Sequence, residues 1–155
     1  MSWKRLLGFA AACLFATGAS AGGSGSALVN HWKKNDVNGT NIFVTNISDS
    51  TVTFYIDLYD QSGTLYDENS EAGDNINVAG FSGDPTTGGG TLQAKQTGNI
   101  VLTNGIGSDR YGSAVIRWES QDDIRIAATG FGYRFYIPSG GRGLVGIDIN
   151  GGAPF

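Results

Sequence analysis

The sequence predicts an all-β protein: a single antiparallel β-sandwich, or a partly open barrel, of about seven to nine strands. Short runs of β-branched and aromatic residues recur along the chain, and Asn-Gly or glycine-rich turns separate them. In the clearest run, residues 52–58, apolar side chains alternate with polar ones, which places an aliphatic row on one face of a strand. After residue 21, no stretch has a sustained helical period.

The first 21 residues predict a cleaved signal peptide. Lys4 and Arg5 precede an apolar segment, residues 6–15, and Ala19 and Ala21 form a cleavage site of the small-x-small type. The apolar segment is too short to cross a bilayer of about 30 Å as a helix, so we expect no retained transmembrane segment. The expected location is therefore secreted or periplasmic, including the cell surface.

Beyond the cleavage point, residues 22–26 are rich in glycine and serine and predict a flexible leader. A first short strand is expected at residues 27–34. Residues 41–60 then predict a β-hairpin, because two β-rich runs flank a turn at residues 48–50. This hairpin is the clearest strand pair in the sequence.

Later segments continue the pattern after a less regular middle third. Further strands are expected at residues 64–66, 76–78, 91–94, 99–103, 112–120, 124–137 and 144–149. We expect those at 91–94 and 99–103 to be edge strands. Gly130 and Gly132 interrupt the longest run, which predicts a bulge, a bend or the close approach of another backbone.

Cleavage after residue 21 would leave 134 of the 155 residues, the size of one domain. We place the sandwich at residues 27–150 and a C-terminal tail at residues 151–155. The only cysteine, Cys13, lies in the signal peptide, so the mature chain has no disulfide. Its stability must come from its apolar core or from oligomerisation.

The charge balance excludes some partners. The formal net charge is −4, from 10 basic and 14 acidic residues, and loss of Lys4 and Arg5 would make it −6. Nucleic acids and anionic membranes need a basic surface, so no nucleic-acid partner is expected. Cations, sugars and other proteins remain compatible with this charge.

Three segments resemble a group of small single-domain β-sandwich proteins that includes the soluble transducer of bacterial sensory rhodopsin. They are residues 46–60, residues 111–116 (Tyr-Gly-Ser-Ala-Val-Ile) and residues 122–128 (Asp-Asp-Ile-Arg-Ile-Ala-Ala). The resemblance implies a compact sandwich that can oligomerise. The family's signalling role does not carry over, because an exported chain could not meet a cytoplasmic face, and no functional residue of the family can be placed here.

The sequence predicts no catalytic residues. His31 is the only histidine, it lies beside Trp32 at the end of a strand, and no Gly-x-Ser-x-Gly elbow accompanies it. The carboxylates, such as Glu119 and Asp123, fall in turns or on wet faces, where a glycosidase acid–base pair is not expected. A single histidine without a mature cysteine also argues against an ordinary zinc site. We therefore expect a protein that is not an enzyme.

An acidic loop at residues 67–75 is the candidate metal site. Asp67, Glu68, Glu71 and Asp74 could supply oxygen ligands to calcium, the one cofactor that the composition allows. The spacing does not match an EF-hand, and a solvated acidic loop without metal is the plainer alternative.

Aromatic residues on the predicted strands are the candidate binding site. The residues concerned are Trp32, Tyr55, Tyr59 and Trp118, with Asp57 between the two tyrosines, and Tyr133 and Tyr136 as further members. If they are exposed on one face, they could stack on sugar rings or contact another subunit; aromatic strand residues also serve as core.

These observations predict a structural or interaction module of the cell envelope that self-assembles through edge strands. Residues 27–32, which follow the leader, are the expected assembling strand. The alternative is a carbohydrate-binding module, with or without calcium.

Overall fold

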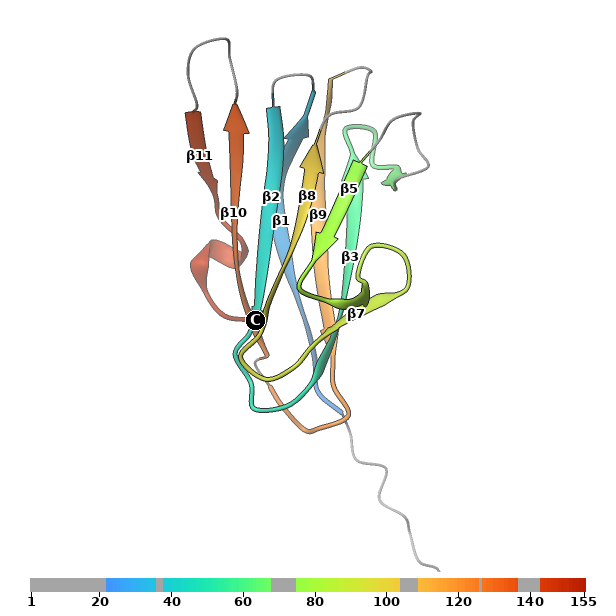
Figure 1. The fold of residues 1–155 in the computed structure, drawn as a ribbon, viewed down its shortest axis with the longest axis vertical. Coiled ribbons are helices and arrows are strands. Elements are labelled where there is room, and N and C mark those ends of the chain that lie inside the picture. Colours follow the sequence, from blue (N-terminus) through green and yellow to red (C-terminus); the bar gives the residue numbers. More distant parts are fainter. Residues whose placement is uncertain (1–21, 36–37, 68–74, 104–108, 126, 137–142) are drawn as a thin grey trace, which may run out of the picture.

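The computed structural model describes residues 22–35, 38–67, 75–103, 109–125, 127–136 and 143–155. These residues form two antiparallel β-sheets that pack face to face (Figure 1). The predicted all-β sandwich is therefore confirmed. No helix in these ranges is long and apolar enough to span a membrane. The predicted signal peptide, residues 1–21, lies outside the described residues.

The larger sheet, called sheet A, has the strand order β1-β9-β3-β7-β6, and β4 also pairs with β3. Its strands are β1 (Ser24–Lys34), β3 (Val52–Asp60), β4 (Leu65–Tyr66), β6 (Ser82–Asp84), β7 (Gly89–Leu92) and β9 (Arg110–Glu119). The smaller sheet, called sheet B, has the order β11-β10-β2-β8-β5. Its strands are β2 (Asn38–Asn46), β5 (Asn75–Ala79), β8 (Thr97–Thr103), β10 (Ala128–Tyr136) and β11 (Gly143–Ile147). The described part of the chain thus has more strands than the seven to nine predicted. The strand at residues 64–66 is present as β4, whereas β6 was not predicted because its three residues, Ser-Gly-Asp, leave no β pattern in the sequence.

The core lies between the inward faces of the two sheets. Side chains alternate across each strand, so every second residue is buried from Val52 to Leu58 in β3 and from Ala114 to Trp118 in β9. The largest fully buried side chains are Trp32, Trp118, Phe54, Ile42, Ile56, Leu58, Leu92, Ile100, Leu102, Ile116, Ile149 and Val29. Each such side chain contributes about 1.5–3 kcal/mol relative to leaving it exposed.

The predicted hairpin at residues 41–60 is wrong, because its two strands belong to different sheets. β2 pairs with β10 and β8, whereas β3 pairs with β9, β7 and β4. The buried side chain of Asn46 holds the corner between them. It donates hydrogen bonds to the carbonyl oxygens of Ser50, just before β3, and of Leu92 in β7. Alternation places apolar rows on both strands, but it does not distinguish strands that lie side by side from strands that face each other across a core.

The two predicted edge strands are also interior strands. β7 lies between β3 and β6, and β8 lies between β2 and β5. Ile100 and Leu102 of β8 are fully buried, while Thr97, Asn99 and Thr103 face outward. The polar outward row explains why this segment looks like an edge in the sequence.

The predicted flexible leader, residues 22–26, is part of the sandwich. β1 begins at Ser24 and pairs with β9. The carbonyl of Gly23 accepts a hydrogen bond from Ser120 N at 2.9 Å. A Cβ at Gly23 would lie 1.9 Å from the carbonyl oxygen of Ile124, so this close approach of two backbones requires glycine.

The C-terminal residues 151–155 are anchored rather than a loose tail. A short 3₁₀ turn, Asn150–Gly152, leads to Phe155, whose side chain is buried. Phe155 and Ala128 exchange two backbone hydrogen bonds, each of 2.8 Å. The last side chain reaches the core, which a glycine-rich sequence does not indicate.

The glycines of β10 make room for neighbouring side chains. β10 pairs with β2 over its whole length without a break in register, so the run contains no bulge where it is described. A Cβ at Gly130 would lie 3.0 Å from Ile149 Cδ1, and one at Gly132 would lie 3.3 Å from Ile147 Cβ. The nearest neighbours are therefore side chains, and backbone carbonyl oxygens follow closely, with Phe43 O at 3.3 Å from the Gly130 position and Asn41 O at 3.4 Å from the Gly132 position.

Candidate functional site

Three predicted binding residues, Tyr55, Asp57 and Tyr59, lie on the outer face of sheet A. They alternate with buried residues along β3 and are each partly exposed. The register places Arg117 of β9 beside Tyr55 and Ser113 beside Tyr59. The prediction that the two tyrosines share an outward face agrees with this pattern.

Tyr55 and Asp57 are bonded to charged side chains of β9. Tyr55 Oη donates a hydrogen bond of 2.5 Å to Glu119 Oε1. Arg117 Nη2 lies 2.9 Å from Asp57 Oδ2, and Arg117 Nε donates to the same oxygen at 3.0 Å. The hydrogen bond to Glu119, followed by burial and the Glu119 charge, raises the pKa of Tyr55, so its hydroxyl is protonated at neutral pH.

The ring of Tyr55 is packed rather than open. The Arg117 guanidinium carbon lies 5.3 Å from the ring centroid, a cation–π arrangement. From β7, a Cβ placed on Gly89 would lie only 2.9 Å from Tyr55 Cε1, so the backbone of β7 approaches the ring closely. These neighbours leave little of the ring for a sugar to stack on.

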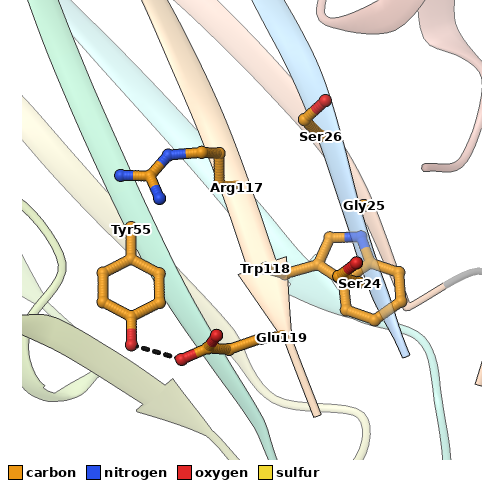
Figure 2. A pocket seen from close by; sticks show the side chains of 7 residues that line it. All are labelled: Ser24, Gly25, Ser26, Tyr55, Arg117, Trp118 and Glu119. Carbon is orange, nitrogen blue, oxygen red and sulfur yellow. Dashed lines mark hydrogen bonds between the residues drawn. The ribbon is translucent and has the colours of Figure 1, made fainter. Parts of the chain in front are cut away.

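Two shallow hollows flank Glu119. Figure 2 shows the first, with Tyr55 on one side and the serines of β1 on the other. It has a volume of about 300 Å³ and is lined by Ser24, Gly25, Ser26, Tyr55, Arg117, Trp118 and Glu119. The second, of about 330 Å³, is lined by Thr51, Thr53, Glu119, Ser120, Gln121 and Asp122. The polar groups in the two linings include hydroxyls, carboxylates, one amide and the Arg117 guanidinium.

The other two predicted binding residues, Trp32 and Trp118, belong to the core. Both are fully buried on inward-facing rows, so the expectation that they are exposed is wrong. Trp32 Nε1 donates to the carbonyl oxygens of Tyr59 at 3.1 Å and Ser113 at 2.9 Å. Trp118 packs beneath β1, where a Cβ on Gly25 would lie 2.5 Å from its Nε1. A ligand in solution cannot stack on either ring.

The predicted calcium loop is described only in part. Asp67 is described and partly buried, whereas Glu68, Glu71 and Asp74 lie outside the described residues. Among the residues that are described, no cluster of three or more His, Cys, Asp or Glu side chains could hold a metal ion. The calcium site stays a prediction.

Sequence reasoning missed an aromatic surface on the outer face of sheet B. Phe43 of β2 and Phe131 and Tyr133 of β10 lie together there. A signal was present in β10, where Phe131 and Tyr133 alternate with Gly130 and Gly132. Aromatic residues on one side of a strand and glycines on the other indicate a close-packed inner face and an aromatic outer face.

The strand expected at residues 144–149 corresponds to β11, and its apolar side chains are unevenly buried. Ile147 and Ile149 are buried. Leu144 is 71% exposed and Val145 is 53% exposed, although successive residues of a strand point to opposite faces. The first part of β11 is therefore uncovered on both faces.

Comparison with known proteins finds no matching family model, no matching curated protein and no matching solved structure. The resemblance to the sensory rhodopsin transducer therefore stays a prediction, and any function must be argued from the side chains and strand edges described above.

Proposed function

We propose that this chain is an exported, non-enzymatic interaction module that associates with a second copy of itself through β11. The observation that carries the proposal is the exposure of Leu144 and Val145 on opposite faces of a strand with one free edge. An edge strand presents unpaired backbone N–H and C=O groups that can pair with another strand. Exposed aliphatic side chains on both faces would be covered by the same event.

The position of β11 supports the proposal. β10 and β11 extend sheet B beyond β1, the nearest strand of sheet A (Figure 1). A β-bridge between Val29 and Ile149 connects the sheets just after β11. A Cβ built on Gly146 meets no atom within 4 Å, so the face of the strand at this position is uncovered.

Two edges of sheet A, β6 and β1, have features that oppose strand addition. β6 is three residues long, and Gly83 within it has a φ of 90°. The pairing of β1 with β9 shifts register between Val29 and Trp32, which is the irregularity that a bulge produces, and Val29 also forms a bridge with Ile149. The predicted assembling strand at residues 27–32 contains this irregularity and is therefore less suited to the role than β11.

The partner that fits β11 best is another β11. The strand, Gly-Leu-Val-Gly-Ile, carries no charge that would repel its copy. In a two-fold antiparallel pair centred on Val145, Leu144 would lie opposite Gly146, which leaves room for the larger side chain. Sheet B of the two copies would then be continuous, and an isologous contact of this kind closes as a dimer.

The satisfied outer face of sheet A supports a non-enzymatic role. Its carboxylates Asp57 and Glu119 are bonded to Arg117 and Tyr55. Carboxylates paired in this way keep the side chains of the surface ordered and are less available as a general base or nucleophile.

The test is the solution mass of the exported chain, measured by light scattering across a range of concentrations. We expect the unaltered chain to reach twice the single-chain mass and Val145→Lys to return it to the single-chain mass, because a charge at an edge strand opposes pairing. Leu65→Lys is the matched control, since Leu65 is 56% exposed on the short strand β4 of the other sheet. A single-chain mass for the unaltered protein at all concentrations, or equal effects of both substitutions, would overturn the proposal.

A further inference from the structure

The outer face of sheet B carries three neighbouring aromatic rings. The ring centroids of Phe43 and Tyr133 are 5.9 Å apart with a 32° angle between the ring planes. Those of Phe131 and Tyr133 are 6.3 Å apart with an angle of 44°. Phe131 is the most open of the three, with 56% of its surface exposed. The rings thus form a short row across β2 and β10, in which Tyr133 neighbours both Phe43 and Phe131.

Neutral hydrogen-bonding groups flank this row. Asn99 Nδ2 donates to Asn41 Oδ1 at 3.2 Å, and Asn41 Nδ2 donates to Tyr133 Oη at 3.2 Å. Further along the same face, Thr45 and Thr97 share a hydrogen bond of 2.8 Å between their hydroxyls. The amide chain fixes the tyrosine hydroxyl and places polar groups beside the rings.

Among the residues of sheet B whose side chains are described, none in an outward position is charged. This follows from the register, which places the same-face residues of neighbouring strands side by side. The outward residues whose side chains are described are Thr129, Phe131, Tyr133, Gly39, Asn41, Phe43, Thr45, Thr97, Asn99, Val101, Thr103, Asn77, Ala79, Leu144 and Gly146. The outer face of sheet A differs sharply, because Asp57, Arg117 and Glu119 lie on it.

We infer that the outer face of sheet B is a binding site for an uncharged oligosaccharide or polysaccharide. The C–H faces of sugar rings stack on aromatic side chains, and the hydroxyl rims pair with amides and hydroxyls. Phe131, Tyr133 and Phe43 provide the first kind of contact. Asn99, Thr45 and Thr97 provide the second, while the buried Asn41 orients the Tyr133 hydroxyl.

The charge pattern selects neutral glycans over acidic ones. An acidic polysaccharide would meet no cation among the described side chains of this face and would be repelled by a chain of net charge −4. A protein partner is less well matched, because amide and hydroxyl groups interleave with the rings and would be buried without new partners in an apolar contact. This site is separate from the β11 edge, and the inference does not rest on the proposed function.

The experiment is retention of the exported chain on insoluble neutral polysaccharides, namely cellulose, chitin and a β-1,3-glucan, with alginate as the acidic comparison. Soluble hexasaccharides of the neutral polymers then give affinities by titration calorimetry. We expect binding to a neutral polymer that falls roughly three- to tenfold in Phe131→Ala, the range for loss of one aromatic contact. Phe131→Trp should retain binding, because the stacking surface is kept.

Tyr59→Ala is the matched control, since Tyr59 is a partly exposed aromatic residue on the outer face of the other sheet. It should leave glycan binding unchanged. Unfolding temperatures should be equal for Phe131→Ala and the unaltered chain, because Phe131 lies outside the core. Light scattering should give both the same mass.

The inference is overturned if no neutral polymer retains the protein, if only alginate does, or if Tyr59→Ala weakens binding as much as Phe131→Ala. A change of mass in Phe131→Ala would also overturn it, because the face would then be a contact between copies. A failure of β11 association would change the mass of the unaltered chain and leave glycan retention intact, so the two proposals fail separately.

Discussion

Replacing Asn46 with alanine should destabilise the protein severely, because this side chain holds the corner at which the chain passes from sheet B to sheet A. Asn46 is fully buried. Its Nδ2 lies 2.7 Å from the carbonyl oxygen of Ser50, 3.0 Å from that of Leu92 and 3.1 Å from that of Gln93. Its Oδ1 accepts hydrogen bonds from Ser48 N at 2.9 Å and Ser48 Oγ at 2.7 Å.

The expected loss follows from these contacts. The amide has two hydrogens, so its donated bonds count as two, and two more bonds are accepted. At about 1 kcal/mol for each bond, Asn46→Ala should lower the free energy of unfolding by about 4 kcal/mol. That is a large share of the roughly 5–15 kcal/mol that stabilises a typical domain.

Urea unfolding followed by tryptophan fluorescence measures the change, since Trp32 and Trp118 are both buried reporters. The midpoint should fall while the slope of the transition stays the same. Asn77→Ala is the control: Asn77 is exposed and donates one hydrogen bond, of 3.3 Å, to Thr103, so its loss should be within about 0.5 kcal/mol. If Asn46→Ala costs no more than the control, Asn46 does not hold the corner.

Three further outcomes are expected. The side chain of Lys33 and then that of Asn35 lower the pKa of Asp109, and Ser62 and Thr64 lower that of Asp60. Because the folded-state pKa values lie below the unfolded ones, this stabilisation is present above about pH 4 and is lost as the pH falls. On acidification, the unfolding temperatures of Asp109→Asn and Asp60→Asn should therefore fall less than that of the unaltered chain. An equal fall would contradict the reasoning. Glu119→Gln should shift the pKa of Tyr55 down toward about 10, which ultraviolet titration against Tyr55→Phe detects, and an unchanged titration would show that Glu119 does not raise it. Gly25→Ala should lower the unfolding free energy by about 1–3 kcal/mol through its clash with Trp118, whereas no loss would mean that residues 22–26 are a loose leader after all.

The strands themselves could largely be predicted from the sequence. Alternation in residues 52–58 and glycine-rich turns reflect local chemistry, and each β-rich run identified in this way contains a strand. Partner choice could not be predicted, because it depends on contacts between distant residues. Asn46 illustrates this: in sequence it reads as the end of a hairpin strand, yet its amide bonds Leu92 O across the fold.

The sequence predicted the candidate site only where the alternation of side chains along a strand determines which residues face outward. Tyr55 and Tyr59 face outward with their row, but nothing local indicates that Arg117 and Gly89 cover the ring of Tyr55. Trp32 and Trp118 are chemically suited to stacking, and only the packing of the second sheet buries them. The aromatic row of sheet B combines Phe43 with Phe131 and Tyr133, which lie almost ninety positions apart in the sequence.

The size of the β11 contact sets the conditions for testing it. Pairing would cover Leu144 and Val145 in each copy, and at about 1 kcal/mol for each partly exposed side chain this contributes roughly 4 kcal/mol. Backbone hydrogen bonds along the strand contribute about 1 kcal/mol each, and loss of rotational and translational freedom opposes association. We expect a dissociation constant on the order of micromolar.

Hydrogen exchange of the Gly143–Ile147 amides as a function of protein concentration tests the central claim most directly. Amides on the free edge of β11 should exchange rapidly in dilute solution and become protected as the concentration rises through the micromolar range, while amides of β4 and β6 keep their rates. Exchange in β11 that is independent of concentration would contradict the account.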